Sequence, residues 1–289
     1  MRSEMSFTLD QIKTFRKLDY PPDLYQFDTI AAGIEGGFEH VSDEDIQFFH
    51  HQGYLVVKDA FNPAEIESAV EGIHNLIEQK YSDFRGVQIE PKLIKQVDDL
   101  TPSQYRNSVR KVYNCLDYEP LLKEIFYAPK LLQIVAQMID AEPVHLQDMA
   151  LLKPAGFGTE KPWHQDGAYF NFSLDETVVG VWIALDKATA NNGCMHVIPG
   201  SHKAPQLHFK KRDWQICDTD IDRNKDVLVP LNPGSVLFFD GLTQHGTPAN
   251  HSDQQRWALQ FHYCSSNAVN ITAEERLEIF GAEGKDVTC

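Results

Sequence analysis

The residues best suited to metal binding lie in segment 161–170, where His164 and Asp166 are two positions apart. In an extended chain, side chains two apart point to the same side, so both can bind one metal ion while Gln165 points away. An imidazole and a carboxylate are two thirds of the 2-His-1-carboxylate set that holds non-haem Fe(II) and leaves coordination positions open. A His-x-Asp pair alone is a weak signal, because it more often makes a surface hydrogen bond than a metal site.

A third ligand is expected from histidines in the turns of the later, β-rich part of the chain: His196, His202, His245, His251 and His262. We favour His245, because it follows an apolar run and precedes Gly246, which lets the backbone pass close to a bound group. His202 is better explained as a turn residue whose ring hydrogen bonds organise its loop.

Three further residues are candidates for binding an acidic ligand. Arg256 opens the last β-like run, and its planar fork of donors suits bidentate capture of a carboxylate, although a solvated arginine is commoner in general. Gln147, on the first run of the β-rich part, can donate to the same ligand. Lys111 lies in a short β-like run at 109–113, where a solvated charge is the commoner explanation.

The elements that must position these residues change character near residue 143. Residues 1–42 show no sustained periodicity and are interpreted as an irregular arm, whereas 43–143 are mainly helical, with a capped start at Ser42 and an apolar stripe over 131–138. The later part contains short β-like runs at 144–152, 178–185, 193–198, 226–230, 235–239 and 257–263. This pattern predicts a β-sandwich or barrel over 144–265, with the helical half packed on one sheet and a tail at 266–289.

Composition limits the possible classes of protein. With 289 residues, 42% hydrophobic and 24% charged, the chain can form one globular domain. A net charge of −16 disfavours binding to nucleic acid or anionic membranes, and no apolar run is long enough to span a bilayer. Five scattered cysteines and the lack of an apolar signal-peptide core favour a cytoplasmic protein.

Together these segments resemble the phytanoyl-CoA dioxygenase family of Fe(II)/2-oxoglutarate-dependent oxygenases. The resemblance covers roughly residues 45–265, and its most diagnostic part is the block at 191–202 that ends in Ile-Pro-Gly-Ser-His. It also rests on segments 164–166, 180–186 and 245–246, and on Arg256. It implies a mainly β fold, a double-stranded β-helix or cupin-like jelly roll with flanking α-helices.

The resemblance also implies an activity, in which a C–H bond of a small organic metabolite is hydroxylated while 2-oxoglutarate is decarboxylated to succinate. Fe(II) and O2 are required, and ascorbate is a candidate reductant. The implied iron ligands are His164, Asp166 and His245. The implied co-substrate residues are Arg256 and Thr247 at the distal carboxylate, with Gln147, Trp182 and Lys111 around the rest.

Several alternatives remain at this stage. Related halogenases replace the iron-binding carboxylate with a small residue, so the intact Asp166 favours hydroxylation. Desaturation, cyclisation or epoxidation at the same iron, and a non-catalytic 2-oxoglutarate sensor, stay open. The chain does not end in the peroxisomal Ser-Lys-Leu signal.

The substrate is expected to be a small polar or anionic molecule. Tyr169 and Phe170 follow the His-x-Asp pair, and alternation from Arg256 puts Gln260 and His262 on the same polar wall, unless these two only hydrogen-bond inside the barrel. Connection 203–225 is predicted to be a lid, because it concentrates basic residues with an aromatic: Lys210, Lys211, Arg212, Trp214 and Arg223. The alternative is that these cations pair with neighbouring acids, namely Asp213, Asp218, Asp220 and Asp222.

Overall fold

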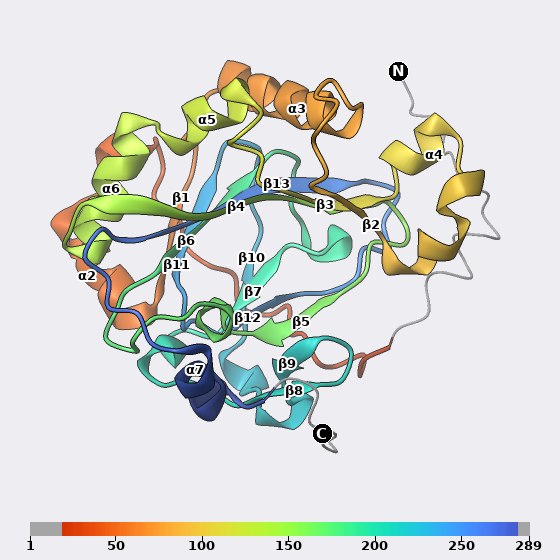
Figure 1. Cartoon of the computed structure of the whole chain (residues 1–289). Helices are drawn as coiled ribbons and strands as arrows, with labels where there is room; N and C mark the ends of the chain where they lie inside the picture. The colour runs from red at the N-terminus through yellow and green to blue at the C-terminus, as the bar shows by residue number, and fades with distance from the viewer. Residues whose placement is uncertain (1–18, 283–289) are drawn as a thin grey trace.

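Two antiparallel β-sheets that face each other form the centre of the protein (Figure 1). The computed structural model describes residues 19–282. The larger sheet has seven strands in the order β1-β11-β6-β13-β4-β3-β2, and the smaller has four in the order β10-β7-β12-β5. Most neighbouring strands are distant in sequence. The predicted jelly roll with flanking helices is confirmed.

Each β-like run that the sequence predicted overlaps a strand of the structure. In the large sheet they are β1 (Tyr54–Val57), β2 (Val87–Ile89), β3 (Val109–Tyr113), β4 (Pro143–Lys153), β6 (Val179–Ala184), β11 (Val236–Asp240) and β13 (Arg256–Ser265). In the small sheet they are β5 (Lys161–His164), β7 (Met195–Val197), β10 (Val227–Val229) and β12 (His245–Thr247). A separate hairpin joins β8 (His208–Lys210) to β9 (Trp214–Ile216). The first half of the chain therefore contributes strands as well as helices.

The helices begin and end where local sequence signals place them. The α-helices are α2 (Asp43–Gln52), α3 (Pro63–Ile77), α4 (Pro102–Arg106), α5 (Pro120–Phe126), α6 (Pro129–Ile139) and α7 (Ala273–Phe280). Short 3-10 helices lie at η1 (Phe38–His40), η2 (Pro91–Asp99), η3 (Asp166–Tyr169), η4 (Ala190–Asn192), η5 (Ser201–Lys203), η6 (Asp218–Asp220) and η7 (Arg223–Lys225). Ser42 caps α2 in a reciprocal capping box with Asp45, and Gly53 ends it with φ 79°.

Alternation along the strands divides the large sheet into two different faces. Outward side chains such as Val181 and Leu259 pack with α3, α5 and α6, whose Ile73 and Val135 are fully buried in the same cluster (Figure 1). Burying side chains of this size contributes about 1.5–3 kcal/mol each. Inward side chains face the small sheet, and toward one end of this space they become polar. That polar end contains the candidate site.

The N-terminal segment from residue 19 lies against the small sheet. Ile30 forms a β-bridge with Leu228, and the Tyr25 ring stacks on the buried Trp163, with ring centroids 5.4 Å apart. Residues 1–18 of the predicted arm and 283–289 of the predicted tail lie outside the described residues. Within residues 19–282, no helix is both long enough and apolar enough to cross a membrane.

Candidate metal and co-substrate site

Three potential metal ligands converge between the two sheets. β12 pairs with β5 so that His245 lies opposite His164, with ring centroids 4.2 Å apart. Asp166 is the first residue of η3, directly after β5. Its Oδ1 lies 3.3 Å from Nε2 of His164, and its Oδ2 lies 3.6 Å from Nε2 of His245. One ligand atom from each residue falls within 4.8 Å of the other two, which is close enough to hold one ion.

Backbone carbonyls orient both imidazoles. Nδ1 of His164 lies 2.8 Å from the Pro162 carbonyl oxygen, and Nδ1 of His245 lies 2.9 Å from that of Thr243. Because a carbonyl only accepts, each Nδ1 must carry the proton, which leaves the Nε2 lone pair facing Asp166. Burial, followed by the nearby His245, lowers the pKa of His164 to about 3. Both features favour neutral rings with Nε2 available as a ligand.

Asp166 is held by two side chains of β13. Its Oδ2 accepts a hydrogen bond from Gln260 Nε2 at 3.1 Å and lies 2.8 Å from His262 Nε2. Burial would raise the pKa of Asp166, but His245 and His262 together lower it well below its usual range. The ionised carboxylate and two neutral imidazoles form the donor set that suits Fe(II). The residues present therefore fit this metal.

A cavity of about 220 Å³ opens onto the three ligands. Eleven of the twelve site residues predicted from the sequence line it: Lys111, Gln147, His164, Asp166, Tyr169, Phe170, Trp182, His245, Thr247, Arg256 and Gln260. His262 is not part of the lining and instead contacts Asp166. The contacts of Gln260 and His262 match the alternative of hydrogen bonding inside the barrel.

The Arg256 side chain lies in this cavity with much of its hydrogen-bonding capacity unused. Arg256 is 3% exposed, and its Nη1 donates to the Leu151 carbonyl at 3.3 Å. Its Nε has no acceptor among the described residues, and its guanidinium carbon lies 5.2 Å from the centre of the Trp182 ring. Burial lowers the pKa of Arg256 to about 10, so the group is still charged at neutral pH. Buried donors are normally partnered, so this geometry suits an incoming carboxylate.

Lys153 is a residue of the site that the sequence analysis missed. Its buried Nζ donates to the Thr247 hydroxyl at 2.8 Å and to the Pro248 carbonyl at 2.6 Å. With one lone pair of the Thr247 hydroxyl occupied, its own proton is free for a ligand in the cavity. Alternation along β4 from Gln147 through Met149 and Leu151 would have placed Lys153 on the cavity face.

Glu90 and Arg110 were also missed, although both line the cavity. Glu90 is 1% exposed and accepts hydrogen bonds from the amide and hydroxyl of Thr159, at 3.1 and 2.8 Å. It thereby anchors the chain just before β5. Nothing in the local sequence of residues 87–92 indicates this role, because the contact joins segments that are far apart.

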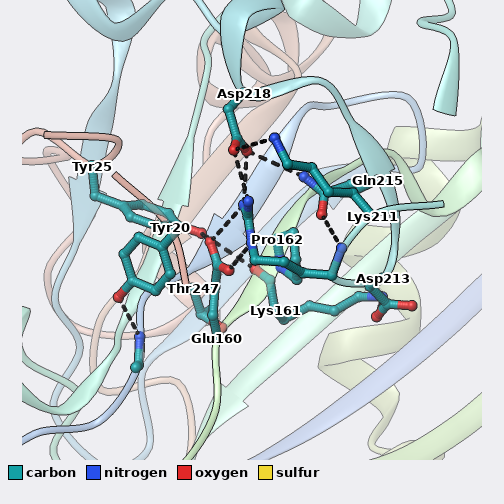
Figure 2. A network of polar contacts seen from close by, with 12 residues as sticks. Tyr20, Tyr25, Glu160, Lys161, Pro162, Lys211, Asp213, Gln215, Asp218 and Thr247 are labelled. Atoms are coloured by element: carbon teal, nitrogen blue, oxygen red, sulfur yellow. Dashed lines mark hydrogen bonds and ion pairs between the residues drawn. The ribbon is translucent and has the colours of Figure 1, made fainter. Parts of the chain in front are cut away.

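In the predicted lid at 203–225, basic side chains form ion pairs with acids. Arg212 donates to Asp218 and to Glu160, each at 2.7 Å, and Lys211 lies 3.5 Å from Asp218 (Figure 2). Neither these cations nor any other residue of 203–225 lines the cavity. The expectation that this basic cluster receives an anion is therefore wrong for Lys211 and Arg212, which pair with acids as in the alternative stated above.

The β8–β9 hairpin, which lies within 203–225, is hydrogen-bonded to residues that line the cavity. Lys161, which lines the cavity, donates to Asp213 at 2.7 Å (Figure 2). It also donates to the Tyr169 hydroxyl at 3.0 Å. The Tyr169 hydroxyl in turn donates to the Trp214 carbonyl at 3.0 Å. The hairpin thus supports η3, the segment that begins with Asp166.

Two other candidate histidines lie elsewhere. His196 is fully buried, and its Nδ1 lies 2.9 Å from Asp226, on the side of the small sheet covered by Tyr25. Nε2 of His202 lies 3.0 Å from the His50 carbonyl oxygen, in agreement with its expected role in organising a turn. Neither lines the cavity.

The chain is similar in sequence to known proteins of one family. A sequence profile of the phytanoyl-CoA dioxygenase (PhyH) family matches residues 49–258. Phytanoyl-CoA dioxygenase domain-containing protein 1 of Danio rerio is 29% identical over 278 residues, covering 82% of this chain and 95% of the relative.

Solved structures share the fold. The non-haem alpha-ketoglutarate-dependent carbocyclase SnoK from nogalamycin biosynthesis superposes with a TM-score of 0.63 at 21% identity, covering 83% of this chain and 90% of SnoK. EctD from S. alaskensis, solved with 2-oxoglutarate and 5-hydroxyectoine, superposes with a TM-score of 0.62 at 19% identity, covering 82% of this chain and 79% of EctD.

Proposed function

We propose that this chain, which belongs to the phytanoyl-CoA dioxygenase family and is a 2-oxoglutarate-dependent dioxygenase, hydroxylates a C–H bond of a small organic metabolite. In such a reaction 2-oxoglutarate is decarboxylated to succinate, and one atom of O2 enters each product. The observation that carries the proposal is the convergence of His164, Asp166 and His245 on a cavity that also contains the buried Arg256.

The three converging side chains would hold Fe(II) on one side and leave its other side open to the cavity. When bound, the metal supplies the activation of oxygen. The protein keeps Nε2 of both histidines unprotonated through the carbonyls of Pro162 and Thr243. Gln260 and His262 hold Oδ2 of Asp166, so that Oδ1 remains for the metal. We therefore assign Gln260 and His262 to positioning the carboxylate and not to the substrate.

Arg256 and Thr247 would bind the distal carboxylate of 2-oxoglutarate. The unpartnered Nε of Arg256 and the hydroxyl proton of Thr247, left free by Lys153, are the donors for it. Lys111, Gln147 and Trp182 line the rest of the same space. Enclosure of these charges away from water strengthens each interaction and keeps the co-substrate oriented.

Tyr169 and Phe170 would meet the primary substrate. Both line the cavity close to Asp166, and the hydroxyl of Tyr169 is fixed between Lys161 and Trp214. The intact Asp166 supports hydroxylation over halogenation. Ascorbate would serve as a reductant.

The test measures succinate formation by the Fe(II)-loaded protein with a panel of small metabolites, and product mass by mass spectrometry. His164→Ala and Asp166→Ala should abolish succinate formation that depends on substrate, whereas His51→Ala, at an exposed histidine on α2, should not change it. Full activity in either ligand variant, with iron supplied, would refute the assignment. A product heavier by one oxygen supports hydroxylation, and a product lighter by two hydrogens indicates desaturation instead.

A further inference from the structure

Two cations on β3 lie at the cavity without an acid partner. Arg110 and Lys111 both line the cavity and are both partly buried. Within residues 19–282, neither side chain forms an ion pair or a hydrogen bond, and the one polar contact is that of the Lys111 ammonium, 5.4 Å from the centre of the Tyr113 ring. In a chain with 42 acidic and 26 basic residues, two neighbouring unpaired cations at a cavity are unexpected.

The other basic residues of the lining already have partners or an assigned ligand. Lys161 is paired with Asp213, and Lys153 donates to Thr247 and Pro248. Arg256 faces the proposed position of the 2-oxoglutarate carboxylate. Burial, followed by the charges of Lys161 and Arg110, lowers the pKa of Lys111 to about 8.

The charges of the cavity do not balance even when the proposed metal and co-substrate are bound. Four cations without an acid partner, Arg110, Lys111, Lys153 and Arg256, line the cavity together with two carboxylates, Glu90 and Asp166. A divalent metal would add two positive charges and 2-oxoglutarate would remove two, so two positive charges remain. An uncompensated charge in a partly buried site is unfavourable, and a second anionic ligand would stabilise it.

Arg110 and Arg256 line the cavity from different strands of the large sheet. β3 is separated from β13 by β4, which places their backbones roughly 10 Å apart. Cavity residues on β3 and the neighbouring β4 include Tyr113 and Met149, which lie opposite each other, and Phe170 also lines the cavity. This end of the cavity therefore offers a cation beside an apolar wall.

We propose that the primary substrate carries a carboxylate that binds Arg110, with its apolar part against Tyr113, Met149 and Phe170. The inference rests on the proposed function and names the substrate class for the same site. The planar guanidinium of Arg110 can donate two parallel hydrogen bonds to a carboxylate. Lys111 remains assigned to 2-oxoglutarate. The anion receptor thus lies on β3 and not on connection 203–225.

The experiment uses a pair of probes of one shape, 3-phenylpropanoate and 3-phenylpropanamide, titrated calorimetrically into the full chain loaded with Zn(II) and 2-oxoglutarate. The acid should bind at least about tenfold more tightly than the amide, the scale of one charged hydrogen bond. Arg110→Gln should weaken binding of the acid by about ten- to hundredfold, to the level of the amide, and leave the Kd of 2-oxoglutarate unchanged. Arg110→Lys should keep part of the preference.

Lys210→Gln is the matched control, because it removes one positive charge from an exposed residue outside the cavity and should change neither probe. Equal binding of acid and amide, no binding of the acid, or an unchanged acid affinity in Arg110→Gln would overturn the inference while 2-oxoglutarate still binds. Failure of 2-oxoglutarate itself to bind the Zn(II)-loaded protein would instead contradict the proposed function, and this inference with it.

Discussion

Replacing Arg256 with lysine separates the charge of this residue from its geometry. The guanidinium is 3% exposed, has an unpartnered Nε, and lies 5.2 Å from the centre of the Trp182 ring. Lysine keeps one positive charge but presents it at a single point. The variant therefore loses the second parallel hydrogen bond to a carboxylate while it retains most of the electrostatic attraction.

The expected cost follows from that one lost bond. A hydrogen bond to a charged group contributes about 1.5–3 kcal/mol, so the Kd of 2-oxoglutarate should rise about ten- to 150-fold in Arg256→Lys. The metal ligands His164, Asp166 and His245 should be unaffected, since no hydrogen bond joins them to Arg256 among the described residues. Metal affinity is thus expected to stay as in the unmodified protein.

The assay is calorimetric titration of 2-oxoglutarate into Zn(II)-loaded protein, with a parallel metal titration and urea unfolding to exclude general damage. Arg223→Lys is the matched control, because Arg223 pairs with the exposed Asp23 and does not line the cavity. An unchanged Kd in Arg256→Lys would show that the carboxylate has another partner. Lys111 would then be the next residue to test.

Two other contacts give quantitative predictions. Gln260→Leu removes a donor to Asp166 Oδ2, so metal affinity, measured by titration with Co(II), should fall about ten- to hundredfold; an unchanged affinity would contradict the positioning role. Arg212→Ala leaves Glu160 and Asp218 buried without their shared cation and should lower the free energy of unfolding by about 3–5 kcal/mol in urea. Arg223→Ala, whose partner is exposed, should cost no more than about 1 kcal/mol, and similar losses in both variants would contradict the argument.

Local patterns were sufficient for the strands and for most of the cavity. Alternation along β13 placed Arg256 and Gln260 on one face, and both line the cavity. The apolar run before His245 predicted β11, and Gly246 beside it lies close to Tyr25 and Trp163, where a Cβ would meet atoms at 3.1 and 3.3 Å. Periodicity succeeds here because each signal lies within one element.

Contacts between distant segments could not be predicted in this way. Arg212 binds Glu160, which is 52 positions away, and Glu90 binds Thr159 across 69 positions. The basic cluster of 203–225 was therefore interpreted as open to a ligand, although its partners lie on other segments as well as nearby. For Lys111 the sequence left two explanations open, a solvated charge or a co-substrate residue, and its position in the cavity lining agrees with the second.

The hydrogen bonds from Nδ1 of His164 and His245 to nearby backbone carbonyls have a thermodynamic consequence. Each ring is oriented by a carbonyl two residues earlier in the chain, and Asp166 is oriented by Gln260 and His262. The ligands are thus arranged by the fold itself, so that little reorganisation is required when an ion arrives. Metal would then act as a stabilising ligand of an already folded chain, and each tenfold increase in free Fe(II) above its Kd would add about 1.4 kcal/mol to the free energy of unfolding.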